Sequence, residues 1–168
     1  NGLIFRATDQ WFCNLQKNDL IERTLKEIEK INFTPEWGRN RLHAFTSNRT
    51  EWCISRQRIW GVPIVAVICD HCGEAFISSD LINKIADKVE KDGIEFWDKV
   101  SLQNLVEQGV LHDVFKCQKC GCSDLSKLRK EQDILDVWFE SGVSHFAVLS
   151  RNVETLGMPA DLYLEGSD

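Results

Sequence analysis

The sequence predicts an α+β chain in which a helical segment is followed by a zinc-ribbon-like insertion and by short strands. Three observations support this fold class. Apolar residues recur at helical spacing in residues 19–31 and 79–90, a β-branched run occupies residues 62–68, and closely spaced cysteines flank the second helical region. With 168 residues and 43% hydrophobic content, the chain is long enough to bury one core, or two small ones, without disulfides.

The first predicted elements are two helices. Residues 19–31 place their apolar side chains on one face and their charged side chains elsewhere, with Asn18 in the position of an N-cap. Pro35 ends this helix and opens a second one over residues 36–47. Three apolar side chains of the second helix are available for packing: Trp37, Leu42 and Phe45.

The middle of the chain predicts a strand and two further helices. The run VPIVAVI at residues 62–68 is typical of a short strand, and it leads directly to Cys69. Residues 79–90 form an amphipathic pattern, and residues 101–108 repeat that pattern more briefly before a glycine at the expected helix stop. We expect the two helices to lie between the cysteine groups as a closed excursion.

The last part of the chain is predicted to be mostly extended. Residues 133–139 favour an extended and partly buried segment, which is followed by a polar loop. A terminal strand is expected at residues 160–164. We find no internal repeat, no low-complexity tract and no flexible linker in the sequence.

The charge of the chain argues against binding nucleic acid by bulk electrostatics, because the formal net charge is −6 and phosphate contacts need clustered Lys and Arg. Any contact with nucleic acid is therefore expected to be local. No apolar run is long enough to span a bilayer, and the first ten residues do not have the pattern of a signal peptide, so we expect a cytoplasmic protein. The basic candidates are Arg49, Arg56, Arg58, Lys127, Arg129 and Lys130, which are equally well explained as solvated surface charges.

Two cysteine groups predict a closed zinc site. Two thiolates separated by two residues can converge on one ion from a tight turn, and the glycine that follows each pair lets backbone amides bend toward the sulfurs. A cytosolic chain keeps its thiols reduced, so zinc is favoured over disulfides, and neither pair lies in a thioredoxin-like context. We predict as ligands Cys69, Cys72, Cys117 and Cys120, with Cys122 as an alternative to Cys120.

The predicted role of this zinc is structural. A catalytic zinc needs an open coordination position and usually His or carboxylate ligands, whereas His71 in the first cysteine pair is expected to be an exposed loop residue. Because metal binding contributes directly to folding in such sites, removal of the ion should leave this part of the chain short of core. Cys13 and Cys53 lie among aromatic and aliphatic residues and are expected to be buried apolar side chains.

Three sequence blocks resemble the isoleucyl members of the class I aminoacyl-tRNA synthetases. They occur in the order of that family and are WCISRQRIWGVP at residues 52–63, DVWFESG at 136–142 and DLYLEGSD at 161–168. The segment LIFRATDQWF at residues 3–12 looks like the point where the editing insertion of that family returns toward the synthetic core. The resemblance therefore covers nearly the whole chain, and DVWFESG favours the isoleucyl members over the valyl and leucyl ones.

The resemblance implies a fragment of a larger enzyme, because both ATP-handling signatures of the family are missing. The intact enzyme would activate isoleucine with ATP and Mg²⁺ and transfer it to tRNA(Ile), whereas the fragment alone is expected to be inactive and monomeric. Residues 1–61 would end the editing insertion and return to the synthetic core. Residues 62–132 would form the zinc-ribbon-like insertion, and residues 133–168 would return to an incomplete α/β catalytic core.

The resemblance also implies two substrate-binding residues and no catalytic residue. Trp138 would form a wall of the amino-acid pocket, and the carboxylate of Glu165 would contact the aminoacyl-adenylate. Such a pocket distinguishes one methylene by only about 1–3 kcal/mol, which explains why the family carries an editing site. The residues Ser55, Arg56, Gln57 and Trp60 resemble the segment that crosses into the synthetic domain, and Trp52, Ile54 and Ile59 are expected to pack.

Two other interpretations remain open from the sequence. The first is an independent zinc-ribbon module that recognises RNA or protein, which would need a basic face with exposed aromatic residues. The second is a fragment of a valyl relative. His145 lacks a recognisable partner for general-base chemistry and is expected to be a polar loop residue.

Overall fold

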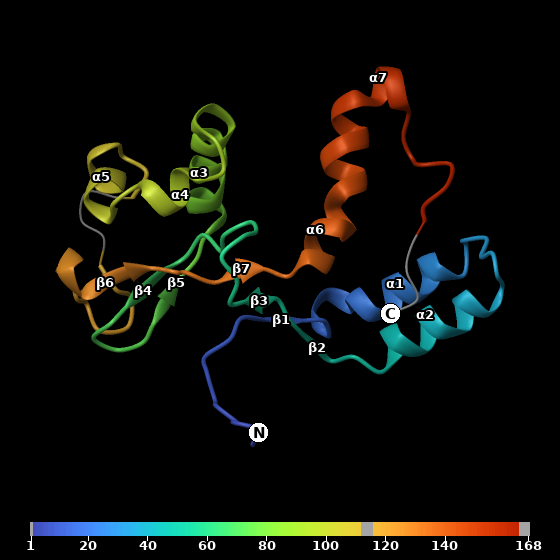
Figure 1. The fold of residues 1–168 in the computed structure, drawn as a ribbon, viewed down its shortest axis with the longest axis horizontal. Coiled ribbons are helices and arrows are strands. Elements are labelled where there is room, and N and C mark those ends of the chain that lie inside the picture. The colour runs from blue at the N-terminus through green and yellow to red at the C-terminus, as the bar shows by residue number, and fades with distance from the viewer. Residues whose placement is uncertain (1, 112–115, 165–168) are drawn as a thin grey trace. The chain divides into compact units, whose positions relative to one another are not determined.

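The computed structural model describes residues 2–111 and 116–164 and combines helices with small sheets, as an α+β fold does (Figure 1). The chain divides into two compact units. Unit 1 takes residues 2–55 and 136–164 of the described chain, and unit 2 takes the described residues between 56 and 135. Each unit is built from local elements whose sequence signals can be followed one by one.

Unit 1 contains the predicted pair of helices. A 3-10 turn at Lys17–Asp19 leads into α1 (Leu20–Ile28), and α2 (Trp37–Ser47) follows after Pro35. The guanidinium of Arg39 in α2 donates hydrogen bonds to three carbonyl oxygens at the end of α1, those of Ile28, Glu29 and Ile31. This interaction satisfies groups that the end of a helix leaves without intrahelical partners.

The predicted N-cap of the first helix is wrong. Asp19 rather than Asn18 occupies the N-cap position, and its side chain makes no capping hydrogen bond. Asn18 and Asp19 both have positive φ angles, which short polar side chains tolerate better than most residues. In the chain, the two helices lie between the strands of an antiparallel pair, β1 (Phe12–Asn14) and β2 (Glu51–Cys53), in which Cys13 is opposite Trp52.

The second part of unit 1 is helical where the sequence predicted extended chain. DVWFESG begins α6 (Val137–Ser144), a π-helical turn at His145–Leu149 and a 3-10 turn at Ser150–Asn152 follow, and α7 (Val153–Leu156) ends the run. The prediction of an extended segment over residues 133–139 holds only for β7 (Ile134–Leu135). The predicted strand at residues 160–164 is also wrong, because those residues pair with no strand in the part of the chain that the structure describes.

Unit 2 contains a three-stranded antiparallel sheet with β4 (Val67–Cys69) in the centre. Its neighbours are β5 (Ala75–Phe76) and β6 (Leu128–Lys130), and Cys69 lies opposite Leu128. The strand predicted at residues 62–68 is therefore confirmed only at its end, and Pro63 forms an isolated bridge with Ile134. A separate pair is made by β3 (Ser55–Arg56) and β7.

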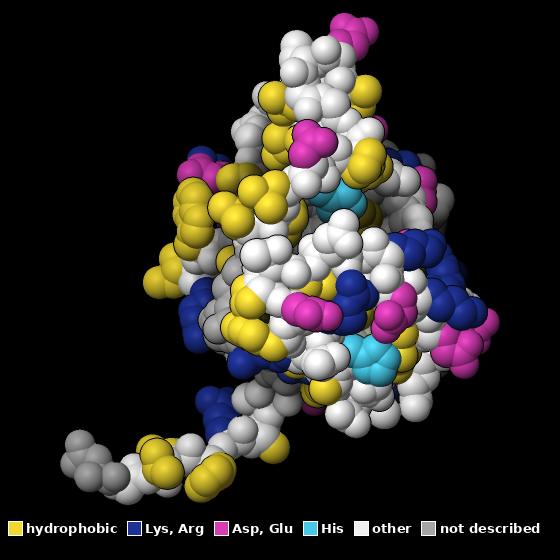
Figure 2. Space-filling view, turned by 90° about the vertical axis from the view of Figure 1, so that its right-hand side faces the viewer, with side chains coloured by type: hydrophobic (Ala, Val, Ile, Leu, Met, Phe, Trp, Pro, Cys, Tyr) yellow, Lys and Arg dark blue, Asp and Glu magenta, His cyan; other side chains and the backbone are white. Residues whose placement is uncertain are grey.

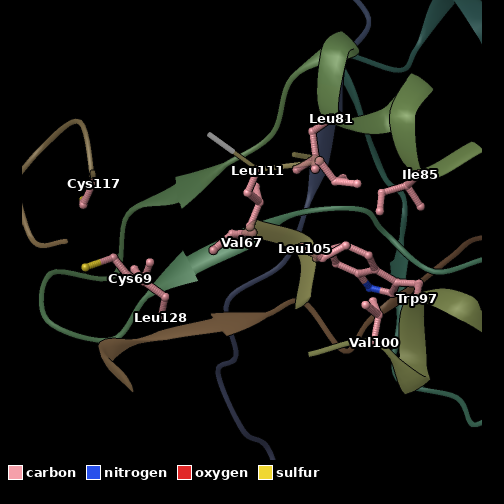
Figure 3. Packing of buried hydrophobic residues seen from close by; sticks show 11 residues of the cluster. Val67, Cys69, Leu81, Ile85, Trp97, Val100, Leu105, Leu111, Cys117 and Leu128 are labelled. Carbon is pink, nitrogen blue, oxygen red and sulfur yellow. The ribbon is translucent and has the colours of Figure 1, made fainter. Parts of the chain in front are cut away.

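Three helices cover the sheet of unit 2, namely α3 (Ser79–Asp92), α4 (Phe96–Lys99) and α5 (Leu102–Glu107). Ser78 and Ser101 cap α3 and α5 by accepting hydrogen bonds from backbone N–H groups two to three residues into each helix. The helices and the sheet enclose one hydrophobic core (Figure 3). Its buried members are Val67, Cys69, Leu81, Ile85, Trp97, Val100, Leu105, Val110, Leu111, Cys117 and Leu128.

Trp97 is the largest side chain of this core and is 0% exposed. Its indole N–H donates to the carbonyl oxygen of Glu131 at 3.4 Å. The ammonium of Lys130 lies 5.4 Å from the centre of the indole ring and donates to the carbonyl oxygens of Trp97, Asp98 and Val100. Partial burial lowers the pKa of Lys130, and the nearby Asp98 opposes that shift.

Several apolar side chains are exposed. The extended N-terminal segment carries hydrophobic side chains on its surface (Figure 2), and Leu3, Ile4 and Phe5 are all more than four-fifths exposed. Ile59 and Trp60 are exposed as well, so the expectation that Ile59 packs is wrong. Within the part of the chain that the structure describes, no helix has the length and apolar character needed to cross a membrane.

Candidate metal centre

Four cysteine side chains converge in unit 2. The sulfur atoms of Cys69, Cys72, Cys117 and Cys120 all lie within 4.8 Å of one another. Cys69 ends β4, and both Cys69 and Cys117 belong to the hydrophobic core (Figure 3), whereas Cys72 is half-buried and Cys120 is exposed. The structure thus brings together the four cysteines that the sequence spacing selected.

The distances between these sulfurs suit a tetrahedral ion better than covalent bridges. The sulfurs of Cys69 and Cys120 are 3.7 Å apart, and those of Cys72 and Cys117 are 3.5 Å apart. Zinc–sulfur bonds of about 2.3 Å in a tetrahedron place neighbouring sulfurs about 3.8 Å apart, whereas a disulfide bond is about 2.05 Å long. All seven cysteines of the chain are free thiols.

The two cysteine turns have the same backbone geometry. The N–H of Gly73 donates to the carbonyl oxygen of Cys69 at 2.8 Å, and the N–H of Gly121 donates to that of Cys117, also at 2.8 Å. Both glycines have φ of 72°, a value that side chains with a Cβ rarely adopt. The glycines therefore allow each turn to close so that its second sulfur faces the other turn.

Backbone N–H groups of the turns point at the sulfurs. The N–H of Cys120, helped by that of Lys119, lowers the pKa of Cys117 to about 7. The backbone N–H of Glu74 donates in the same way to the sulfur of Cys72, and the backbone N–H of Cys122 donates to the sulfur of Cys120. These N–H groups favour thiolates, which are the form of cysteine that binds metals.

The crowding of four thiols opposes this effect at two positions. The N–H of Cys122 lowers the pKa of Cys120, but burial of the sulfur and the three neighbouring thiols outweigh it and raise that pKa to about 12. For Cys72 the N–H of Glu74 likewise lowers the pKa, and burial and neighbouring thiols raise it overall. A divalent cation would supply the positive charge that four thiolates at these distances require.

Cys122 contributes through its backbone and its packing. Its carbonyl oxygen accepts a hydrogen bond from the N–H of Cys117 at 2.9 Å. Its half-buried side chain packs against the hydrophobic core, and its sulfur is outside the group of four. His71 is exposed and is likewise outside this group. The geometry therefore favours Cys120 over Cys122 as the fourth ligand.

One ion pair joins the two cysteine turns, and another joins the first turn to β6. The ammonium of Lys119 lies 3.5 Å from the carboxylate of Glu74, and Nε of Arg129 lies 2.9 Å from that of Asp70. Lys130 is engaged with the carbonyl oxygens around α4. Of the basic residues considered for RNA contacts, Arg129 and Lys130 thus have partners within the chain, which weakens the interpretation as an RNA-binding module.

The residues expected to contact substrate are only partly covered by the structure. Trp138 lies in the first turn of α6 with its side chain 46% exposed, so it is not an ordinary core residue. Glu165 lies outside the described residues. His145 is in a π-helical turn rather than in a loop, and its Nδ1 lies 3.0 Å from the carbonyl oxygen of Gly142.

The block WCISRQRIWGVP includes buried and exposed positions. Ser55 is buried, where its hydroxyl donates to Oε1 of Gln10 and accepts from the N–H of Trp11. Gln57 donates to the carboxylate of Asp133 at 2.7 Å, whereas the side chain of Trp60 is 82% exposed. Cys13 and Cys53 are half-buried, so the expectation of full burial is wrong for both.

Sequence reasoning missed Asp136. This residue is 2% exposed and caps α6, because its Oδ1 accepts a hydrogen bond from the N–H of Trp138 at 3.1 Å. Its Oδ2 accepts a second hydrogen bond from the indole N–H of Trp52 at 2.9 Å. An aspartate directly before an apolar run is a recognised sign of a helix start and was available in the sequence.

Comparison with known proteins agrees with the sequence blocks. A family model described as tRNA synthetases class I (I, L, M and V) matches residues 3–168. The chain belongs to this family of class I tRNA synthetases. The resemblance proposed from the three sequence blocks is therefore confirmed.

Among the class I synthetases, the similar curated proteins are isoleucine–tRNA ligases. An isoleucine–tRNA ligase of Geobacter sulfurreducens is 47% identical over 166 residues, which cover 99% of this chain and 17% of the relative. Isoleucine–tRNA ligases of Petrotoga mobilis and Kosmotoga olearia are 44% and 45% identical over 168 residues, again 17% of each relative. The chain thus spans about a sixth of the length of these synthetases.

Proposed function

We propose that this chain is a central section of an isoleucine–tRNA ligase. The complete protein would activate isoleucine with ATP and Mg²⁺, release pyrophosphate and transfer the aminoacyl group to tRNA(Ile). The observation that carries this proposal is the identity of 44–47% with isoleucine–tRNA ligases along the whole chain. The section alone would be inactive, and we assign the protein to the cytoplasm.

Within this section we assign three parts. Residues 1–61 would end the editing insertion and return to the synthetic core, residues 62–132 would form a zinc-ribbon-like lobe, and residues 133–168 would return to the catalytic core. Trp138 would form part of the wall of the isoleucine pocket, to which an exposed indole offers a large and rigid apolar surface. Glu165 would accept hydrogen bonds from the aminoacyl-adenylate.

The lobe would hold one structural zinc ion through Cys69, Cys72, Cys117 and Cys120. A set of four sulfurs is typical of closed structural sites, and the distances between the sulfurs fit such an ion. Zinc bound there would join the two cysteine turns and stabilise the lobe. Because Cys69 and Cys117 are also core residues, the ion would stabilise hydrophobic packing and metal coordination together.

The enzymatic proposal is tested by exchange of pyrophosphate into ATP, catalysed by the complete protein that contains this chain. We expect exchange that depends on isoleucine, with valine much less efficient as a substrate because its side chain lacks one methylene. Exchange that favours valine would replace the isoleucyl assignment with the valyl one. Absence of exchange with either amino acid, from protein shown to be folded, would contradict the proposed function.

The metal proposal is tested by zinc analysis of this chain and of two matched serine variants. We expect one zinc ion per chain, loss of zinc in Cys120→Ser, and retention of zinc in Cys122→Ser. The two positions are two residues apart in the same turn, so a general effect of the substitution would appear in both variants. Loss of zinc in Cys122→Ser with retention in Cys120→Ser would show that the fourth ligand has been assigned wrongly.

A further inference from the structure

Asp136 is a buried carboxylate whose two oxygen atoms bind different parts of unit 1. One oxygen accepts the backbone N–H of Trp138, and the other accepts the indole N–H of Trp52, which is 84 residues away in the sequence. Burial of a carboxylate is costly unless its oxygens are hydrogen-bonded. The carboxylate therefore connects the start of α6 to strand β2.

Two further contacts support the same connection. The backbone N–H of Asp136 donates to the carbonyl oxygen of Ile54 at 2.7 Å. The ring of Trp52 lies 6.2 Å from that of Phe139, at an interplanar angle of 46°. Asp136 and Phe139, which lie on either side of Trp138 in the sequence, thus both contact the segment that contains Trp52.

Asp136 differs from the two serines that cap α-helices of unit 2. Ser78 and Ser101 each cap a helix of unit 2 by accepting one backbone N–H. A cap requires only one acceptor, and a serine supplies it without burying a charge. The second oxygen of Asp136 is not needed to begin the helix, and it serves the hydrogen bond to Trp52.

The side chain held at this point is that of Trp138. Its backbone N–H is fixed by Asp136, while its indole remains 46% exposed. The backbone sets the direction of the Cα–Cβ bond, and the side chain then adopts one of a few staggered rotamers about that bond. A shift of the first turn of α6 would therefore redirect the indole.

We propose that Asp136 and Trp52 form a positioning pair that orients Trp138 in the isoleucine pocket. This inference rests on the proposed function, in which Trp138 contacts the side chain of isoleucine. Neither Asp136 nor Trp52 would touch the reacting atoms. The pair would affect recognition of the amino acid and leave the binding of ATP unchanged.

The test uses pyrophosphate exchange by the complete protein with Asp136→Asn and with Trp52→Phe. In asparagine an NH2 group, which donates and cannot accept, replaces one of the two oxygens that receive the N–H groups, and phenylalanine retains a ring beside Phe139 without the N–H. If the contribution of one hydrogen bond to a charged group is lost from the binding of isoleucine, the KM for isoleucine should rise about tenfold. The KM for ATP and kcat should change by less than about twofold, which corresponds to about 0.4 kcal/mol.

The double variant provides a second measurement. If Asp136 and Trp52 act as one unit, Asp136→Asn with Trp52→Phe should raise the KM for isoleucine no more than the more severe single variant does. Multiplication of the two single effects would mean that the residues act independently and would overturn the positioning pair. Thermal unfolding of every variant shows whether it is folded under the conditions of the assay.

Two controls separate this inference from the proposed function. Ser78→Ala removes a helix cap in unit 2, so it should lower stability while the KM for isoleucine stays unchanged. Trp138→Leu should raise that KM, and failure to do so would overturn the pocket role of Trp138. If Trp138→Leu raises the KM while Asp136→Asn and Trp52→Phe lower only the melting temperature, the positioning pair is wrong and the pocket role stands. An equal rise in the KM for ATP would also refute the pair.

Discussion

The core of unit 2 offers a matched comparison between two tryptophans. Trp97 is 0% exposed and Trp60 is 82% exposed, and both belong to unit 2. A buried aromatic side chain removes about 150–250 Å² from water. At about 25 cal/mol per Å², its burial contributes about 4–6 kcal/mol, of which Trp→Ala substitutions usually remove about 3–5 kcal/mol as the cavity partly collapses.

The expected loss for Trp97→Ala is large compared with the total stability of a small domain, which is about 5–15 kcal/mol. Urea unfolding of the zinc-loaded chain, followed by circular dichroism, measures the change in the free energy of unfolding. Trp60→Ala should change that free energy by less than about 0.5 kcal/mol, because exposed positions rarely contribute more. Equal losses in the two variants would refute the assignment of Trp97 to the core and of Trp60 to the surface.

Three further predictions concern stability. Lys130→Met should lower the free energy of unfolding by about 1.5–3 kcal/mol, since charge-assisted hydrogen bonds to carbonyl oxygens are lost, whereas Lys91→Met at an exposed helical position should have little effect. Gly61→Ala should destabilise by about 1–3 kcal/mol, because φ is +150° and an added Cβ would overlap the side chain of Ile134. Gly142→Ala should instead stabilise α6 by up to about 1 kcal/mol, since nothing lies within 4 Å of the added Cβ. Denaturant unfolding measures all of these changes, and a stabilising Gly61→Ala or a destabilising Gly142→Ala would contradict the reasoning.

The features that the sequence predicted well depend on local geometry. Helical periodicity at residues 79–90 became α3, because an amphipathic face and a serine cap are both encoded within a few residues. The spacing of the cysteines identified the group of four sulfurs, since each pair closes its own turn with the help of a glycine. The spacing selected Cys120 but left Cys122 as an alternative, because spacing does not show which sulfur faces the turn at Cys69 and Cys72.

The features that were predicted wrongly depend on distant partners. Aromatic and β-branched residues around Trp138 suggested extended chain, but Asp136 begins a helix there by accepting the N–H of Trp138, and its other oxygen is bound by the distant Trp52. The strand expected at residues 160–164 fails because no other strand pairs with it among the described residues. The exposure of Ile59 likewise depends on the tertiary arrangement, which the residue type alone does not define.

The double membership of Cys69 and Cys117, in the hydrophobic core and in the group of four sulfurs, links two properties that are usually measured separately. Any substitution that loosens the packing around these cysteines also disturbs the spacing of their sulfurs. A chelator competition titration would then register core mutations made well away from the thiols. The affinity for the ion would therefore report on the packing of the hydrophobic core of unit 2.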